Sequence, residues 1–188
     1  MDLRELDRRA VAATGAIIDG LTDEQLDAET PCTRWAVRDV VQHMVDNHRT
    51  ALDTFGDGAP EPGADVRTEW RRTAAAVVDL FADDAVLAAS YEVVGRSTNG
   101  RTALSLHFGD TLVHGWDIGT AVGLHVRIDD DLAEAMLAGI ARWPKTAQVW
   151  GPDGFFARQL PVAEGATPTE RLLAATGRDA AWTPAGRS

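Results

Sequence analysis

The chain has 188 residues, 45% hydrophobic and 25% charged, which is the composition of an ordinary globular domain long enough to bury a core. Its net charge of −11 is spread thinly without a basic stripe, so neither nucleic acid nor an anionic membrane surface is an expected partner. The chain has no apolar run of membrane-spanning length, and its N-terminus carries acidic residues where a signal peptide would have a basic region and an apolar core. Its single cysteine, Cys32, has no internal partner, so we expect a cytoplasmic protein.

Apolar residues recur at helical spacing in most of the chain, which predicts an all-α fold. The predicted helices cover residues 3–21, 34–55, 66–81, 102–123, 129–143 and 169–176. Residues 56–65 are rich in Gly and Pro and predict a loop, and residues 88–94 predict an irregular excursion or a single strand. The apolar stretch at 155–162 either pairs as a strand or lies across the helices.

Several long helices joined by short breaks favour a helical bundle. We predict an antiparallel four-helix bundle in residues 1–144. Residues 145–188 are expected to form a short irregular appendage with one short helix, packed on the bundle.

The helix predicted over residues 102–123 carries a polar strip through an otherwise apolar element. His107, Asp110, His114 and Asp117 recur at steps of three and four, so they share one narrow face. A helix that is apolar nearly all round is usually buried, and buried imidazoles and carboxylates are costly unless partners satisfy them. The strip therefore requires a compensating partner.

A divalent metal ion is one such partner. Asp110 and His114 stand at i and i+4 and point the same way, so they can offer an oxygen and a nitrogen to one ion. A third ligand must come from another element, and the second long helix offers His43 and His48. Periodicity places His48 in the middle of the apolar face and His43 at its edge. His107 is a further alternative, in place of His43 or as a fourth ligand.

Three separated motifs resemble a known family. TPCTRWAVRDVVQHMVDN, followed two helices later by GDTLVHGWDIGTAVG and then by PTERLLAATGRDAAW, is similar to the actinobacterial branch of the DinB-like superfamily. That branch includes the metal-binding domain of mycothiol-dependent maleylpyruvate isomerase. The resemblance covers nearly the whole chain and implies a DinB-like bundle built around a metal ion.

The resemblance also implies the ligands and the cosubstrate. The family's motif histidine and its acid-x-x-x-His pair fall here on His43, Asp110 and His114, with Asp where the isomerase has Glu. Two imidazoles and a carboxylate suit zinc first, and nickel or iron as well. Mycothiol is the implied thiol, because a metal-coordinated thiol is deprotonated and becomes a nucleophile near neutral pH. His48 is then a core residue, and no catalytic residue is expected beyond the metal site.

Charged residues near the motifs have two interpretations each. Asp117 and Asp39 are candidates either for hydrogen bonds that orient the ligands or for partners at a helix end. Arg96 and Arg101 precede the central helix and would bind a carboxylate of the thiol or the substrate. Solvated loop arginines are the alternative.

The aromatic residues, the cysteine and the glycines are equally ambiguous. Trp116, together with Trp35, would line a pocket for the thiol or substrate, or simply pack. Cys32 is either a small buried apolar residue or, near a helix start, a redox thiol. The glycines of the central helix admit either a neighbouring helix or a bulky thiol: Gly109, Gly115 and Gly119.

These features favour a metal- and mycothiol-dependent enzyme that performs S-transfer or isomerisation on a small electrophile. The alternatives are a non-catalytic metal-binding bundle with a regulatory or stress role, and a metal-free module that binds a small molecule. An enzyme should leave coordination positions facing solvent, whereas a structural site should be closed by a fourth ligand such as His107. The isomerase carries a larger second domain, so maleylpyruvate is not the expected substrate. We expect a monomer or a homodimer.

Overall fold

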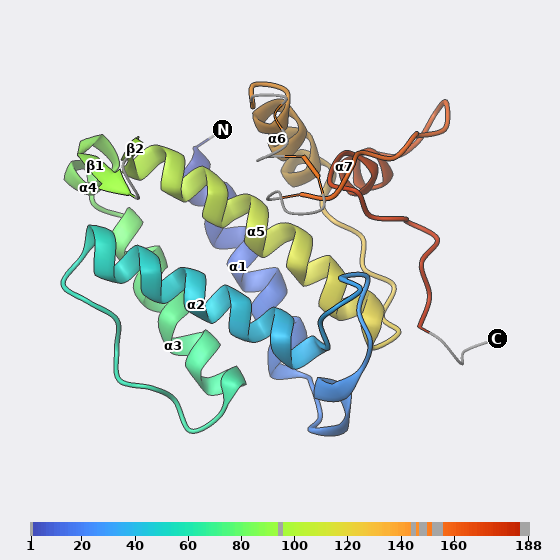
Figure 1. Cartoon of the computed structure of the whole chain (residues 1–188), viewed down its shortest axis with the longest axis horizontal. Coiled ribbons are helices and arrows are strands. Elements are labelled where there is room, and N and C mark those ends of the chain that lie inside the picture. Colours follow the sequence, from blue (N-terminus) through green and yellow to red (C-terminus); the bar gives the residue numbers. More distant parts are fainter. Residues whose placement is uncertain (1, 94–95, 144–145, 147–149, 152–155, 185–188) are drawn as a thin grey trace.

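The computed structural model describes residues 2–93, 96–143, 146, 150–151 and 156–184. Four helices form a bundle (Figure 1). They are α1 (Leu3–Asp19), α2 (Val37–Phe55), α3 (Val66–Phe81) and α5 (Gly100–Ala121). The predicted all-α, DinB-like four-helix class is confirmed.

Contacts between the helices fix their directions. Between α1 and α5 the residue numbers of contacting pairs rise together, so these helices run parallel: Asp7 contacts His107, Thr14 contacts Gly115, and Ile17 contacts Gly119. Between α2 and α5 the order reverses: His43 with His114, and His48 with His107. Between α2 and α3 the residue numbers rise together again: His48 with Thr73, and Gly56 with Leu80. The order along the chain is therefore up, down, down, up. The predicted antiparallel arrangement holds for α2 and α5, but it is wrong for α1 and α5 and for α2 and α3, which run parallel.

The parallel pair α2 and α3 requires a connection that returns over the length of the bundle. Residues 56–65 provide it, and they run along the outside of the helices in Figure 1. At about 3.4 Å per residue this loop reaches about 34 Å, whereas the 19 residues of α2 are about 28 Å long. The predicted Gly- and Pro-rich loop is long enough for this crossing.

Local capping sets where the helices begin. The Asp65 carboxylate accepts backbone N–H groups at the start of α3, and Asn99 Oδ1 accepts the N–H of Thr102 in α5. Helix α2 begins at Val37 rather than at residue 34, because Ala36 is extended and its N–H donates to Asp39 at 2.9 Å. Asp39 therefore caps a helix, which is the helix-end role among its two predicted roles.

The segment before α5 is more regular than predicted. A short helix, α4 (Asp84–Ala88), is followed by β1 (Ser90–Val93) and β2 (Arg96–Asn99), which pair antiparallel from Ser90 with Asn99 to Val93 with Arg96. Of the two alternatives predicted for residues 88–94, the single strand is confirmed as β1. Its partner β2 was not predicted, because the polar residues of β2 carry no apolar alternation.

Two further helices, α6 (Asp130–Ile140) and α7 (Pro168–Ala175), pack against each other beside the bundle. Helix α6 ends at Ile140, earlier than the predicted end at residue 143, and Pro144, which is expected to stop this helix, lies outside the described residues. In the stretch at 155–162, Phe156 forms an isolated bridge with Trp150. A shared core joins both helices to α1 and α5 and includes Leu6, Ala10, Phe108, Leu112, Trp116, Leu132, Met136, Leu172 and Leu173. The boundary at residue 145 stays a prediction.

Helix α5 is buried on nearly all sides, as its composition predicts. Its glycines face protein side chains rather than open space, because a Cβ built there would meet a neighbouring residue. These neighbours are Met136 for Gly109, Thr14 for Gly115 and Val126 for Gly119. Among the described residues, no helix combines the length and apolar character needed to cross a membrane.

Candidate metal centre

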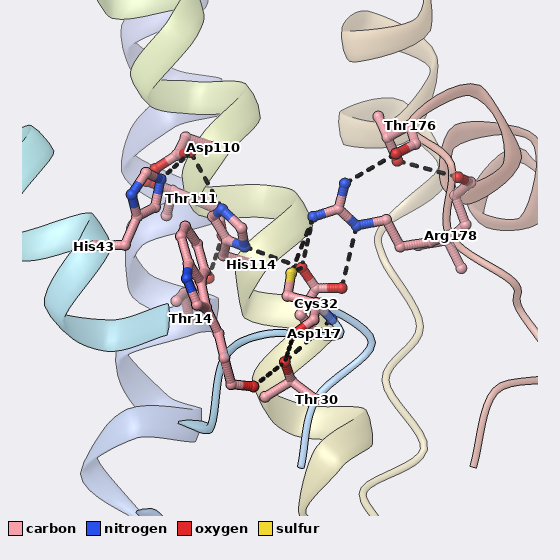
Figure 2. A network of polar contacts seen from close by, with 12 residues as sticks. Thr14, Thr30, Cys32, His43, Asp110, Thr111, His114, Asp117, Thr176 and Arg178 are labelled. Atoms are coloured by element: carbon pink, nitrogen blue, oxygen red, sulfur yellow. Dashed lines mark hydrogen bonds and ion pairs between the residues drawn. The ribbon is translucent and has the colours of Figure 1, made fainter. Parts of the chain in front are cut away.

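The structure brings together His43 of α2 with Asp110 and His114 of α5. One ligand atom of each lies within 4.8 Å of the other two. Asp110 Oδ1 is 3.5 Å from His43 Nε2 and 3.4 Å from His114 Nε2 (Figure 2). The i, i+4 spacing on α5 aims Asp110 and His114 at one point, and Asp, though shorter than Glu, reaches both imidazoles.

These separations fit a divalent ion. Two ligands bound to a tetrahedral ion at about 2.1 Å lie about 3.4 Å apart, which is the separation of the Asp110 oxygen from each imidazole nitrogen. Asn47 Nδ2 donates to Asp110 Oδ2 at 3.2 Å and lies 3.1 Å from His43 Nε2. The amide thus holds the carboxylate and His43 at the outer edge of the same cluster.

The second ring nitrogen of His114 supports the same conclusion. His114 Nδ1 lies 2.9 Å from Asp117 Oδ2, and an ionised carboxylate only accepts, so Nδ1 carries a hydrogen. In the neutral ring the lone pair of Nε2 then faces Asp110 Oδ1. Two acceptors this close repel each other unless a cation, a proton or a metal ion, lies between them.

Asp117 has two further partners that sequence reasoning missed. Arg178, which follows α7, donates from Nη2 to Asp117 Oδ2 at 2.9 Å and from Nε to Oδ1 at 3.3 Å. The half-buried Cys32 Sγ lies 3.3 Å from Asp117 Oδ2 (Figure 2). The predicted hydrogen bond between Asp117 and a candidate ligand, His114, is present. Cys32 contacts a buried carboxylate, so it is more than a small apolar residue of the core.

The charges in this cluster shift one another's pKa values. Burial opposes ionisation, but His114 and His43 outweigh it and hold the pKa of Asp110 well below its usual value. Burial also opposes protonation of His114, but Asp110 and Asp117 raise the pKa of His114 well above its usual value. Burial is likewise overcome at Asp117, where Arg178 and His114 lower the pKa to about 2.

One side of the cluster is open to solvent. The side chains of His43 and Asp110 are 32% and 27% exposed, whereas His114 is 9% exposed. The Trp35 ring lies 4.7 Å from the ring of His43 and 6.2 Å from that of His114, measured between centroids. Trp35 therefore forms an aromatic wall beside the two imidazoles, and the exposed edge lies at His43 and Asp110.

The other two histidines considered as ligands lie elsewhere in the bundle. His48 is buried, as periodicity predicted, and its Nδ1 lies 2.9 Å from Thr73 Oγ1, within hydrogen-bond distance. His107 Nδ1 lies 2.7 Å from Asp7 Oδ1 on α1. The structure gives His107 a partner in Asp7 and does not group it with Asp110 and His114.

Of the residues predicted to contact the thiol, Trp35 lies at this cluster, whereas Trp116 and Arg101 do not. Trp116 is 4% exposed in the core shared with α1 and α6, so packing accounts for it. Arg101 is exposed in the first turn of α5, about 20 Å along the helix axis from His114. Arg96 begins β2. A role for either arginine in binding thiol or substrate stays a prediction.

The raised pKa of His114 predicts that the metal-free protein loses stability in alkali. A group whose pKa is higher in the folded state stabilises the fold fully below its unfolded value, near 6.5, and loses this contribution as pH rises through the folded value. In chelator-treated protein, we expect the free energy of unfolding from urea titrations to fall above pH 7, by up to about 1.4 kcal/mol per pH unit. His114→Gln should flatten this slope and His125→Gln should not. An equal slope in all three proteins would contradict the ion pair.

Comparisons with known proteins match more than half of the chain to one family. A family model described as the mycothiol maleylpyruvate isomerase N-terminal domain matches residues 8–119, which include all three clustered residues. Uncharacterised proteins of Mycobacterium tuberculosis strains CDC 1551 / Oshkosh and ATCC 25618 / H37Rv are each 29% identical over 181 residues. These alignments cover 95% of this chain and 98% of each relative. No solved structure matches. Because the family model spans more than half of its length, the chain belongs to the mycothiol maleylpyruvate isomerase N-terminal domain family.

Proposed function

We propose that this protein is a metal- and mycothiol-dependent enzyme that acts on a small electrophile by S-transfer or isomerisation. The observation that carries the proposal is the convergence of His43, Asp110 and His114 beside solvent, in a chain of a mycothiol-related family. Their two nitrogens and one oxygen suit zinc first, and also nickel or iron.

The three residues would occupy three coordination positions on one side of the ion. The remaining coordination positions would be open to a ligand from solvent. A bound divalent ion would supply a Lewis acid that lowers the pKa of a thiol enough to make it a nucleophile near neutral pH. Asn47 holds the Asp110 carboxylate and His43 together at the rim. Trp35 shields one side of the imidazoles from water and offers an apolar surface to the electrophile.

The exposure of the cluster favours an enzyme over the alternative of a non-catalytic metal-binding bundle. A structural site is normally closed by four protein ligands. In the part of the chain that the structure describes, the cluster offers three, and His107, the candidate for a fourth, lies 2.7 Å from Asp7 instead. A substrate-binding position is therefore the simplest use of the open side.

A thiol-consumption assay tests the proposal. Zinc-loaded protein is mixed with mycothiol and chlorodinitrobenzene, where the thiolate sulfur forms a bond to the ring carbon, chloride leaves and the thiol proton passes to solvent. We expect a rate above the uncatalysed reaction that is lost after chelation, lost in His43→Ala and His114→Ala, and kept in His125→Ala. Because the electrophile is a model compound, maleate isomerisation with mycothiol is assayed in parallel. Thiol chemistry that is equally fast in all four proteins would refute the proposal.

A further inference from the structure

We propose that Arg178 is a positioning residue of the metal centre, which acts through Asp117 to fix the orientation and the tautomer of His114. The inference rests on the proposed function only for its consequence, metal binding. Arg178 lies beyond residues 8–119, which the family model matches. A role for Arg178 therefore makes the C-terminal segment part of the metal centre.

The guanidinium of Arg178 is turned inward and is almost fully engaged. Its side chain is 11% exposed, and it spans Asp117 with Nε on Oδ1 and Nη2 on Oδ2. Nη1 donates to the backbone oxygen of Thr176 at 2.9 Å, and Nη2 also lies 3.4 Å from Cys32 Sγ. A two-point contact of this kind fixes the plane of the carboxylate, so Arg178 serves Asp117 and is not presented to a substrate.

Asp117 needs such a partner because its side chain is 0% exposed. A buried carboxylate without a paired cation is strongly destabilising. With Arg178 in place the carboxylate remains ionised and accepts the Nδ1 hydrogen of His114 at 2.9 Å. This leaves the Nε2 lone pair for an ion shared with Asp110 and His43, since the tautomer of a ligating histidine is set by the partner of its other nitrogen.

The backbone around Arg178 is built to aim this side chain. The N–H of Arg178 donates to Leu173 O at 2.8 Å, and Leu173 is buried in the core that joins α7 to α1 and α5. Gly177 has φ +78°, and a Cβ there would lie 2.6 Å from Ala157 Cβ. Only glycine adopts this turn without strain, so the direction of Arg178 is a property of the fold.

The test compares Arg178→Gln and Arg178→Lys with Arg171→Gln, a matched change at an arginine of α7 that pairs with Glu134 instead. Zinc affinity is measured by competition with a chromophoric chelator, and coordination by the visible spectrum of the cobalt-loaded protein. We expect Arg178→Gln to lose 10- to 100-fold in affinity, as is typical of partners of metal-bound histidines, and to change the cobalt spectrum. Arg178→Lys should recover part of the loss, and Arg171→Gln should match the wild type.

A second measurement separates this inference from the proposed function. The hydrogen on Nδ1 of His114 should give a slowly exchanging imidazole resonance in the nuclear magnetic resonance spectrum of the metal-free wild type, and Arg178→Gln should shift or abolish it. If the wild type bound no metal, the proposed function would fail while this resonance still tested Arg178. The inference would be overturned if Arg178→Gln kept the zinc affinity, the cobalt spectrum and the imidazole resonance of the wild type. If Arg178→Gln does not fold, the same three measurements are made on Arg178→Lys.

Discussion

His114→Ala is expected to reduce the affinity for zinc at least about 100-fold. Structural zinc sites with four ligands bind with about 10–16 kcal/mol, or about 3 kcal/mol for each ligand, and 1.4 kcal/mol corresponds to a factor of ten. His114 is the least exposed of the three clustered side chains, so water cannot easily take its place. Competition titrations with a chromophoric chelator measure the change.

His125→Ala is the matched control, because His125 is exposed on the loop after α5. Asp110→Asn keeps the shape of the carboxylate but removes its charge, so it should also weaken binding. Full metal content in purified His43→Ala and His114→Ala, measured by elemental analysis, would show that the ligand assignment is mistaken.

Gly115→Ala is expected to lower the free energy of unfolding by about 2 kcal/mol. A Cβ at this position would lie 2.2 Å from Thr14 Oγ1, between two packed helices, and overfilling a close-packed core typically costs about 1–3 kcal/mol. The comparison is Gly139→Ala in α6, where a Cβ meets nothing within 4 Å. That substitution should stabilise the protein by up to about 1 kcal/mol through helix propensity.

Urea denaturation of the two variants therefore gives changes of opposite sign from the same chemical substitution. Thr14→Ala in the Gly115→Ala background should restore part of the loss, because it removes the oxygen that the new methyl group meets. Equal effects at positions 115 and 139 would argue against close packing of α1 on α5.

The sequence predicted the parts of the site that depend on local spacing. Asp110 and His114 share a helix, so i, i+4 periodicity was enough to place them together. His43 was harder, because periodicity alone favoured His48 as the more central residue, and the motif was needed to choose between them. The structure agrees with both observations: His48 is buried, and His43 lies at the rim of the bundle.

The contacts of Arg178 and Cys32 with Asp117 could not be predicted in the same way. They join three distant parts of the chain, and each depends on the path of a loop or a turn rather than on helical repeat. The β2 strand was missed for a related reason, since Ser, Thr and Asn there suit a turn as well as a strand. Tertiary pairing decides such segments.

The ion pair between Arg178 and Asp117 also has a consequence for biosynthesis. Translation delivers α2 and α5 to the ribosome exit before α7, because α7 comes later in the sequence. A nascent chain would thus contain every candidate ligand before Arg178 could fix the orientation of His114 through Asp117. Under the proposed function, the metal centre would reach its final geometry only after α7 has docked.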